Sequence, residues 1–404
     1  SRGNTLLALK RYAEALDAYD KGLAQEPDDT VMWYNRGLSL ENLGRFEDAL
    51  EAYDRTVTVS PTDADAWAKR GAALIRLGRY DESIEAFDRA LPLMPDTSSI
   101  WQLKGTALRK CHRPSEAMAA FEKAINLDDT NAQAHLGKGW ALYALGKYEE
   151  SLAAFDRALA LDPDHPDTWC RKGCSLCRMG LVEEAIAAFD RALSTKPDSS
   201  LTLFCKASAF LRIQKYEDAI TTFDASLALN GEYAPAWFGK ADALFQVQRF
   251  SDAVAAYGSG LSIDSGNAGI WYKKGNVLSD LGQHREALTA YDRALAIDPS
   301  RPAAWNAKGI TLMGLGRYED AVAAFDRALS TDPADPLVLA NKGMALIQLG
   351  RYEESAAICD RALEHLPEDA DIWFSKGIAL LRLAAFPDAI DAFDQVLAIR
   401  ADDA

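Results

Sequence analysis

Four cysteines near the middle of the chain have the residue type and the spacing to bind a metal ion. Cys170, Cys174 and Cys177 read C-x3-C-x2-C, and Cys205 follows. On a helix the first three fall on one stripe, and Cys205 could face Cys174, so a four-thiolate zinc or iron–sulfur site is conceivable. An iron–sulfur motif needs a loop that wraps the cluster, however, and cysteine is also a common small apolar filler. The filler interpretation is favoured, and we expect no metal and no cofactor.

No other set of side chains in the sequence suggests catalysis. There is no Gly-rich phosphate loop, and no nucleophile, base and acid occur in a recognisable set. The histidines lack paired ligand spacing and fall at expected helix ends, at turns or at a repeated tryptophan position: His112, His135, His165, His284 and His365. Most Asp and Glu residues mark expected helix starts and turns. We therefore predict that the chain is not an enzyme.

Composition and charge narrow the range of partners. The chain has 404 residues, a net charge of −16 and a pI near 4.9. An acidic chain repels phosphate backbones and anionic lipid head groups, so nucleic acid and membrane surfaces are poor candidates. No apolar stretch approaches the ~20 residues that a membrane span needs. Six cysteines without a secreted disulfide pattern indicate a reducing setting, and we expect a cytoplasmic protein.

The elements that would position any site follow from a repeat of 34 residues. Eight tryptophans share one repeat position, a small residue follows four positions later, and an aromatic residue recurs sixteen positions after that. The tryptophans are Trp33, Trp67, Trp101, Trp169, Trp237, Trp271, Trp305 and Trp373. Full units begin near residues 30, 64, 98, 132, 166, 200, 234, 268, 302, 336 and 370, after a partial unit at 1–29.

Within one unit, residues 302–335, the apolar pattern predicts two antiparallel helices. Trp305 and Gly309 recur at helical spacing on the first helix, which Gly316 ends. Phe325 lies on the buried stripe of the second helix, and Pro333 closes the unit. In other units Gln214, Gln248 and Ala384 replace the inter-helix glycine, and we expect looser turns in the repeats at residues 200–267, which are the least regular.

This pattern resembles the tetratricopeptide repeat family, whose units read W-x2-L-G-x2-Y, A-x3-F and P at the same period. The units W-x-x-K-G and A-F-D-R-A-L-x-x-D-P look like those of archaeal and bacterial members. The resemblance covers residues 1–404 as one continuous array. It implies an all-α solenoid, a right-handed superhelix of about twelve helix pairs with a concave and a convex side.

The resemblance also implies that the first helix of each unit lines the concave groove. When the ligand-facing positions of the family are carried over to this sequence, they fall on the fifth, ninth and twelfth residues of each unit. These residues are mostly apolar or aromatic. The strongest candidates for a partner-binding groove are Tyr34, Trp140, Tyr143, Phe204, Phe238, Phe245, Tyr272 and Phe374. The alternative is that these side chains pack against neighbouring first helices inside a tight superhelix.

A basic subset of residues lies on the same helices. The candidates for anchoring acidic side chains or a terminal carboxylate are Lys69, Arg76, Arg109, Lys110, Arg178 and Arg212. Scatter is the alternative, since helix ends commonly carry Lys and Arg. The family's carboxylate clamp is incomplete, because Asp65 stands where a Lys is required.

These observations predict a scaffold or adaptor that binds another protein. The partner would be an apolar protein or peptide segment with acidic groups, and neither nucleic acid binding nor membrane insertion is expected. Ser1 falls inside the first helix of its unit and Ala404 follows the last helix. We therefore expect either a fragment of a longer protein, including the regulatory arm of an enzyme with a separate catalytic domain, or a structural array that self-associates through its open terminal repeats.

Overall fold

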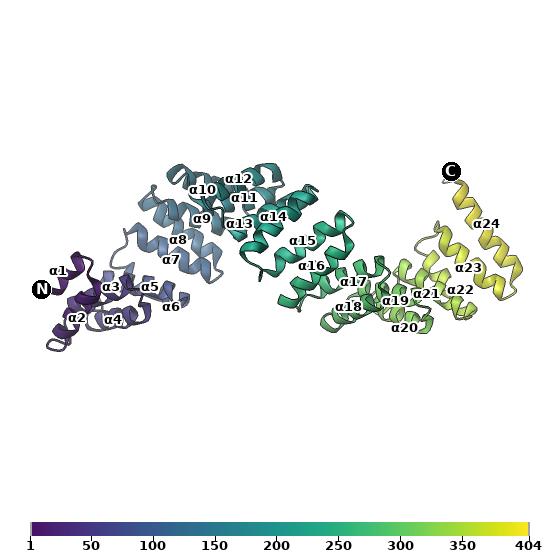
Figure 1. Cartoon of the computed structure of the whole chain (residues 1–404), viewed down its shortest axis with the longest axis horizontal. Helices are drawn as coiled ribbons and strands as arrows, with labels where there is room; N and C mark the ends of the chain where they lie inside the picture. The colour runs from purple at the N-terminus through teal and green to yellow at the C-terminus, as the bar shows by residue number, and fades with distance from the viewer. Residues whose placement is uncertain (1, 403–404) are drawn as a thin grey trace. The chain divides into compact units, whose positions relative to one another are not determined.

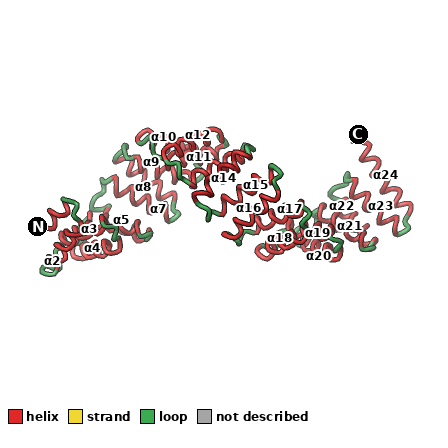
Figure 2. Tube along the Cα trace, viewed as in Figure 1, coloured by secondary structure: helices red, strands yellow, loops and turns green. Residues whose placement is uncertain are grey.

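The computed structural model describes residues 2–402, and side chains up to residue 400, so Ser1 and Ala404 lie outside the described residues. The described chain forms twenty-four α-helices and no β-strand, joined by short turns (Figures 1 and 2). This arrangement confirms the predicted all-α fold of about twelve helix pairs. The chain divides into two compact units, residues 1–209 and residues 210–404. A single continuous array stays a prediction.

The first unit contains helices α1 to α12 and most of α13, arranged as successive antiparallel pairs. Their bounds are α1 (Arg2–Ala8), α2 (Tyr12–Leu23), α3 (Thr30–Asn42), α4 (Phe46–Val59), α5 (Ala64–Arg76), α6 (Tyr80–Ala90), α7 (Ser98–Lys110), α8 (Pro114–Leu127), α9 (Ala132–Ala144), α10 (Tyr148–Leu161), α11 (Pro166–Met179), α12 (Val182–Thr195) and α13 (Ser200–Arg212). The boundary between the units falls inside α13.

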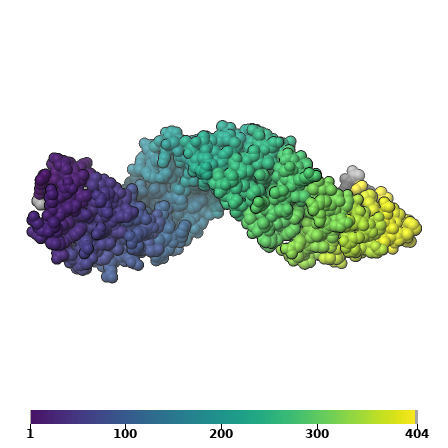
Figure 3. Space-filling view, turned by 60° about the horizontal axis from the view of Figure 1, so that its bottom comes forward, coloured from purple at the N-terminus to yellow at the C-terminus, as the bar shows by residue number. Residues whose placement is uncertain are grey.

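The second unit continues the same alternation of helices. Its helices are α14 (Tyr216–Leu229), α15 (Ala234–Gln246), α16 (Phe250–Ile263), α17 (Ala268–Asp280), α18 (His284–Ile297), α19 (Pro302–Gly314), α20 (Tyr318–Leu329), α21 (Pro336–Gln348), α22 (Tyr352–Leu363), α23 (Ala370–Arg382) and α24 (Phe386–Asp402). In the space-filling view, successive repeats of each unit stack directly on one another (Figure 3).

Most helix pairs close on an aromatic ring that fills the space left by a glycine. In the pair α19 and α20, a Cβ added at Gly309 would lie 2.5 Å from the ring of Phe325, which is fully buried. The same contact recurs between Gly71 and Phe87. Because a ring and a Cβ cannot share this space, the recurring glycine sets how closely the two helices approach.

Polar contacts fix the ends of the helices and the stacking of the pairs. The Asp63 carboxylate caps α5 by accepting from the amide of Ala66 at 2.9 Å. The Trp305 indole donates to the carbonyl of Pro299, and Lys308 pairs with Asp292 at 2.6 Å. Equivalent contacts recur in most repeats. We infer that the recurring cation of the W-x-x-K pattern is structural.

The turns that lack glycine are as regular as those that have it, so the expectation of looser turns was wrong. Gln214, Gln248 and Ala384 take φ values of 59°, 61° and 59°, close to the 72° of Gly316. The amide of Lys215 closes its turn on the carbonyl of Phe210 at 3.0 Å. Helix packing therefore imposes the left-handed backbone conformation at this turn position. The conformation costs roughly 1–2 kcal/mol when the residue is not glycine.

The odd-numbered helices form one layer in each unit. Most of them contact the next odd-numbered helix, as α7 contacts α9 and α19 contacts α21, and most even-numbered helices pack against the odd-numbered helices that flank them. We call the surface of the odd-numbered layer the inner face of each unit. None of the helices within residues 2–402 combines the length and the apolarity needed to cross a bilayer.

Candidate functional site

All the residues predicted to bind a partner lie on odd-numbered helices. In the first unit the most distinctive is Trp140 on α9, which is half-buried. The guanidinium of Arg171, on α11, lies 3.7 Å from the centroid of the indole ring, and that of Arg109, on α7, lies 5.4 Å from it. Three successive inner-face helices therefore contribute one cation–aromatic–cation cluster, which we call the Trp140 cluster.

The two arginines of the Trp140 cluster share no carboxylate. Within residues 2–402, neither Arg109 nor Arg171 forms an ion pair with an Asp or Glu side chain. Burial lowers the pKa of Arg109, and the positive charge of Arg171 lowers it further. Two cations held at one indole ring without a counter-charge favour the binding of an anion between them.

The repeat register shows how unusual this arrangement is. Lys273, on α17, occupies the same repeat position as Arg171, and Asp242, on α15, occupies that of Trp140. There the two residues form an ion pair of 2.7 Å. Lys69 also occupies this position and pairs with Glu41 at 3.3 Å. In the first unit, the indole of Trp140 thus stands at the position from which a carboxylate would neutralise Arg171.

Sequence reasoning missed Arg171, although the signal was present. Lys69 was singled out as a basic anchor, and Arg171 stands at the same position three repeats later. Apart from Arg109, the predicted anchors do not join the Trp140 cluster. Arg76 stacks on Phe46 at 4.8 Å, and Arg178 donates to the Tyr148 hydroxyl at 3.1 Å.

Two further anchors, Lys110 and Arg212, are exposed at the ends of α7 and α13. Arg212 belongs to the second unit, so the cations do not form one patch in a single unit. Of the basic residues predicted from the sequence, Arg109 alone lies in the Trp140 cluster.

Aromatic side chains extend the inner face beside Trp140. The ring of Tyr143 lies 6.3 Å from Trp140 and 5.5 Å from Tyr148, centroid to centroid, in edge-on arrangements. Burial raises the pKa of Tyr143, so its hydroxyl stays protonated and can donate a hydrogen bond at neutral pH. Tyr34, on α3, is half-buried and lies 6.0 Å from Tyr53.

In the second unit a pocket of about 380 Å³ opens between α15 and α17 beside Phe245. Its lining is partly apolar and partly polar: Leu211, Tyr216, Asp242, Phe245, Gln246, Tyr257, Lys273, Asn276 and Val277. The Asp242 carboxylate accepts from the Tyr257 hydroxyl and pairs with Lys273. Because these charges are already paired, the pocket offers an apolar wall rather than a free charge.

The remaining predicted aromatic residues differ in exposure. Phe374 is 46% exposed and Tyr272 and Phe204 are half-buried, whereas Phe238 is only 9% exposed. The Phe238 ring fills the space that a side chain at Gly260 would need, because a Cβ added at Gly260 would lie 2.3 Å from the ring. Phe238 is therefore a core residue, and its placement in the groove is corrected.

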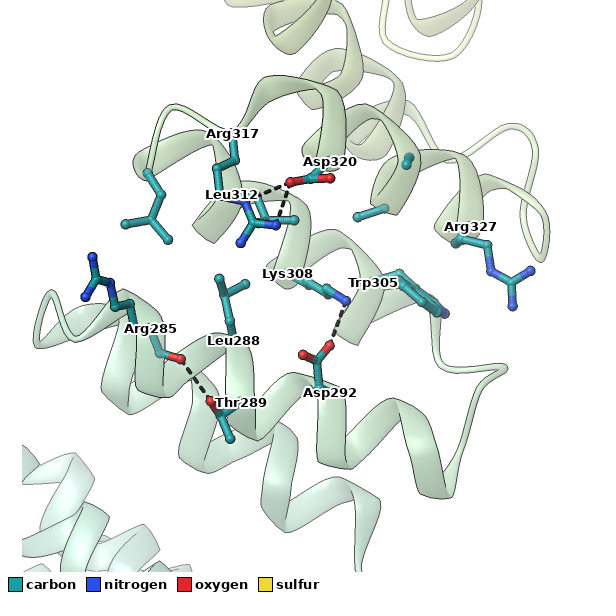
Figure 4. Close-up of a pocket in the computed structure, with 13 residues that line it drawn as sticks. Arg285, Leu288, Thr289, Asp292, Trp305, Lys308, Leu312, Arg317, Asp320 and Arg327 are labelled. Carbon is teal, nitrogen blue, oxygen red and sulfur yellow. Dashed lines mark hydrogen bonds and ion pairs between the residues drawn. The ribbon is translucent and has the colours of Figure 1, made fainter.

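A larger pocket, of about 700 Å³, lies across α18, α19 and α20 (Figure 4). Lys308 reaches Asp292 across it, Arg317 pairs with Asp320, and Arg327 extends past the indole of Trp305. The sequence did not single out this pocket. Its ion pairs are framework contacts that recur in other repeats, so it carries no feature of its own.

The thiols of Cys170, Cys174 and Cys205 come together on α11 and α13, with their sulfur atoms all within 4.8 Å of one another. Cys177 is not a member of this group, so the C-x3-C-x2-C spacing does not act as one motif.

Comparison with known proteins places these repeats in a family. Two family models, both described as "Tetratricopeptide repeat", match the chain. One matches residues 1–63, 34–96, 103–166, 204–268 and 272–336, and the other matches residues 142–203 and 312–373. A search of curated proteins finds no match.

Solved structures give likenesses of fold. "YrrB: a TPR protein with an unusual peptide-binding site" is 25% identical, covers 47% of this chain and 98% of its own, and has a TM-score of 0.41. MamA is 21% identical, with coverage of 42% and 92% and a TM-score of 0.39. The "APC/C hetero-tetramer Cut9-Hcn1" is 15% identical, with coverage of 98% and 92% and a TM-score of 0.44.

Proposed function

Because the chain belongs to the tetratricopeptide repeat family, we propose that it is a protein-interaction scaffold that binds a partner segment on its inner face. The observation that carries the proposal is the Trp140 cluster. An indole flanked by two unpaired guanidiniums combines an apolar surface with a site for one carboxylate. The partner segment would therefore place an Asp or Glu side chain between Arg109 and Arg171, and an apolar side chain against Trp140 and Tyr143. A non-catalytic role is part of this proposal.

Charge complementarity supports an acidic rather than a basic segment. The chain as a whole is acidic, yet the Trp140 cluster concentrates positive charge on one part of the inner face. A hydrogen bond to a charged group contributes roughly 1.5–3 kcal/mol, and loss of one arginine would weaken binding by roughly 10- to 150-fold. Because the contact is between charged groups, we also expect binding to weaken as salt rises, although less than for fully exposed charges.

The test is comparative capture from a lysate of the source organism, followed by measurement on a defined peptide. The variant R109A/R171A is compared with R55A/K123A, which removes two exposed positive charges from the even-numbered helices α4 and α8. A protein recovered by the native chain and by R55A/K123A, and lost with R109A/R171A, supports the proposal. The bound segment is then synthesised, and its affinity is compared with that of a version in which Gln and Asn replace Glu and Asp.

The proposal fails if R109A/R171A binds the recovered segment as tightly as the native chain does. It also fails if the neutral peptide binds as well as the acidic one. In either case the aromatic surface alone, or another part of the inner face, holds the partner.

Self-association is a second candidate function, which we propose on a different observation. Helix α24 exposes Phe386, Ile390 and Leu397, at 57%, 59% and 67%. The position of Ile390 is buried in earlier repeats, as at Ile84 and Val322. A second copy could cover this stripe. Light scattering of the native chain and of I390E/L397E would show mass that rises with concentration only in the native chain, and equal masses would refute this candidate.

A further inference from the structure

We propose that Cys170, Cys174 and Cys205 bind one soft divalent cation of the zinc type through three thiolates. This site goes beyond the proposed scaffold function and does not depend on it. It also replaces the filler interpretation of these cysteines, because three of the four thiols meet at one point.

The distances fit a single ion. Two sulfurs bound to one tetrahedral zinc ion at about 2.3 Å lie about 3.8 Å apart. The Cys174 and Cys205 sulfurs are 3.9 Å apart, and the Cys170 sulfur completes a group within 4.8 Å. Binding would therefore need only a small movement of side chains. An iron–sulfur cluster fits less well, because its cysteines are spread over several iron atoms.

The repeat geometry builds this site in advance. Cys174 and Cys205 stand at the positions of Trp140 and Arg171 one repeat earlier, and of Asp242 and Lys273 further on. Both of those pairs are in contact, so two regular helices bring the side chains at these positions together. Cys170 lies one helical turn before Cys174 and adds the third sulfur. Ligands on rigid helices lose little entropy on binding a metal.

The electrostatics favour a divalent ion. A divalent cation would leave three thiolates with a net charge of only −1. Cys170 is only 4% exposed, so its anionic form needs a nearby positive charge. A bound cation would supply this positive charge.

Three protein ligands leave one coordination position of a tetrahedral ion for water or another donor. Cys174 and Cys205 are only partly buried, so water can reach the sulfur atoms of the site.

The experiment uses the full chain, reduced and freed of metal by a chelator, and titrated with Cd²⁺ as a spectroscopic probe. We expect a cadmium–thiolate charge-transfer band that saturates at one ion per chain, and a Zn²⁺-dependent rise in the melting temperature. C174S and C205S should lose the band and bind about 100-fold more weakly or worse. C177S, on the same helix, and C111S, elsewhere in the first unit, should keep the band.

Circular dichroism of each variant, measured without metal, separates loss of the site from loss of the fold. If C174S is poorly folded, C205S and the Zn²⁺-dependent melting temperature of the native chain decide the matter. The proposal is overturned if the native chain, with all six thiols reduced, gives no band. It is also overturned if C174S and C205S keep the band, or if a Cys174–Cys205 disulfide forms in air in the presence of Zn²⁺.

Discussion

Removing Arg171 should leave the stability of the first unit nearly unchanged at low salt. The guanidinium carbons of Arg109 and Arg171 lie 5.4 and 3.7 Å from the centroid of one indole ring, so they are at most about 9 Å apart. At an effective dielectric constant of about 20, two unit charges at this distance repel by about 1.8 kcal/mol. The contact of Arg171 with Trp140 contributes roughly 0.5–2 kcal/mol in the opposite direction. The two effects offset each other, and the free energy of unfolding of R171A should stay within about 1 kcal/mol of the native value.

At high salt the native chain and R171A should differ in their free energy of unfolding. The Debye length falls from about 10 Å at 0.1 M to about 3 Å at 1 M, so salt screens the repulsion more than it weakens the short cation–π contact. The native chain should therefore gain stability relative to R171A, by about 1 kcal/mol. Urea denaturation followed by circular dichroism and tryptophan fluorescence at both salt concentrations measures this change.

A neighbouring variant provides the control. Lys172 pairs with Asp156 at 2.6 Å and lies over Trp169, so K172A should be destabilised at low salt by up to about 1 kcal/mol, and less at high salt. The reasoning is refuted if R171A is less stable than the native chain by more than about 2 kcal/mol at both salt concentrations. Arg171 would then be a structural residue, and the argument for an acidic partner would lose its basis.

Three further predictions concern the framework. Gly258 stands where other repeats place the acidic partner of the recurring cation, and burial lowers the pKa of that cation, Lys274. G258D should therefore raise the free energy of unfolding of the second unit by about 1 kcal/mol in urea denaturation, and G258N should raise it by less. G309A should cost about 1–2 kcal/mol, because its Cβ would meet a buried ring at 2.5 Å; an unchanged urea midpoint would show that the ring can move. The hydrogen bond from Arg79 lowers the pKa of Glu82, so this pair stabilises the fold above the unfolded pKa and the effect is lost as pH falls through the folded pKa. E82Q should therefore melt below the native chain at pH 7 and together with it near pH 2, and a gap that persists in acid would contradict this assignment.

The sequence predicted the helix pairs well because the repeat states the same local rules many times. Trp305, Gly309 and Phe325 each recur at fixed positions, and their contacts are those expected from helical spacing. The turn at Gln214 was misjudged, because residue preference favours glycine there while tertiary packing imposes the left-handed conformation.

The candidate site was predicted less completely. Trp140 and Arg109 were identified from the sequence, but Arg171 was not, since only the structure shows that its guanidinium covers the indole. Phe238 was assigned to the groove by its repeat position. Gly260, which stands where most other repeats have Ala, could have warned that the ring turns inward.

The sequence by itself determined the fold class, the period and the helices that carry the candidate site, because these depend on spacing along the chain. The tertiary structure decided which charges are already paired. Lys69 meets Glu41, and Lys273 meets Asp242, whereas Arg171 meets Trp140. It also decided that Cys205, rather than Cys177, joins Cys174. The physical reason is that charge pairing and metal geometry depend on side chains of neighbouring repeats, whose separation is set by packing and not by any local spacing.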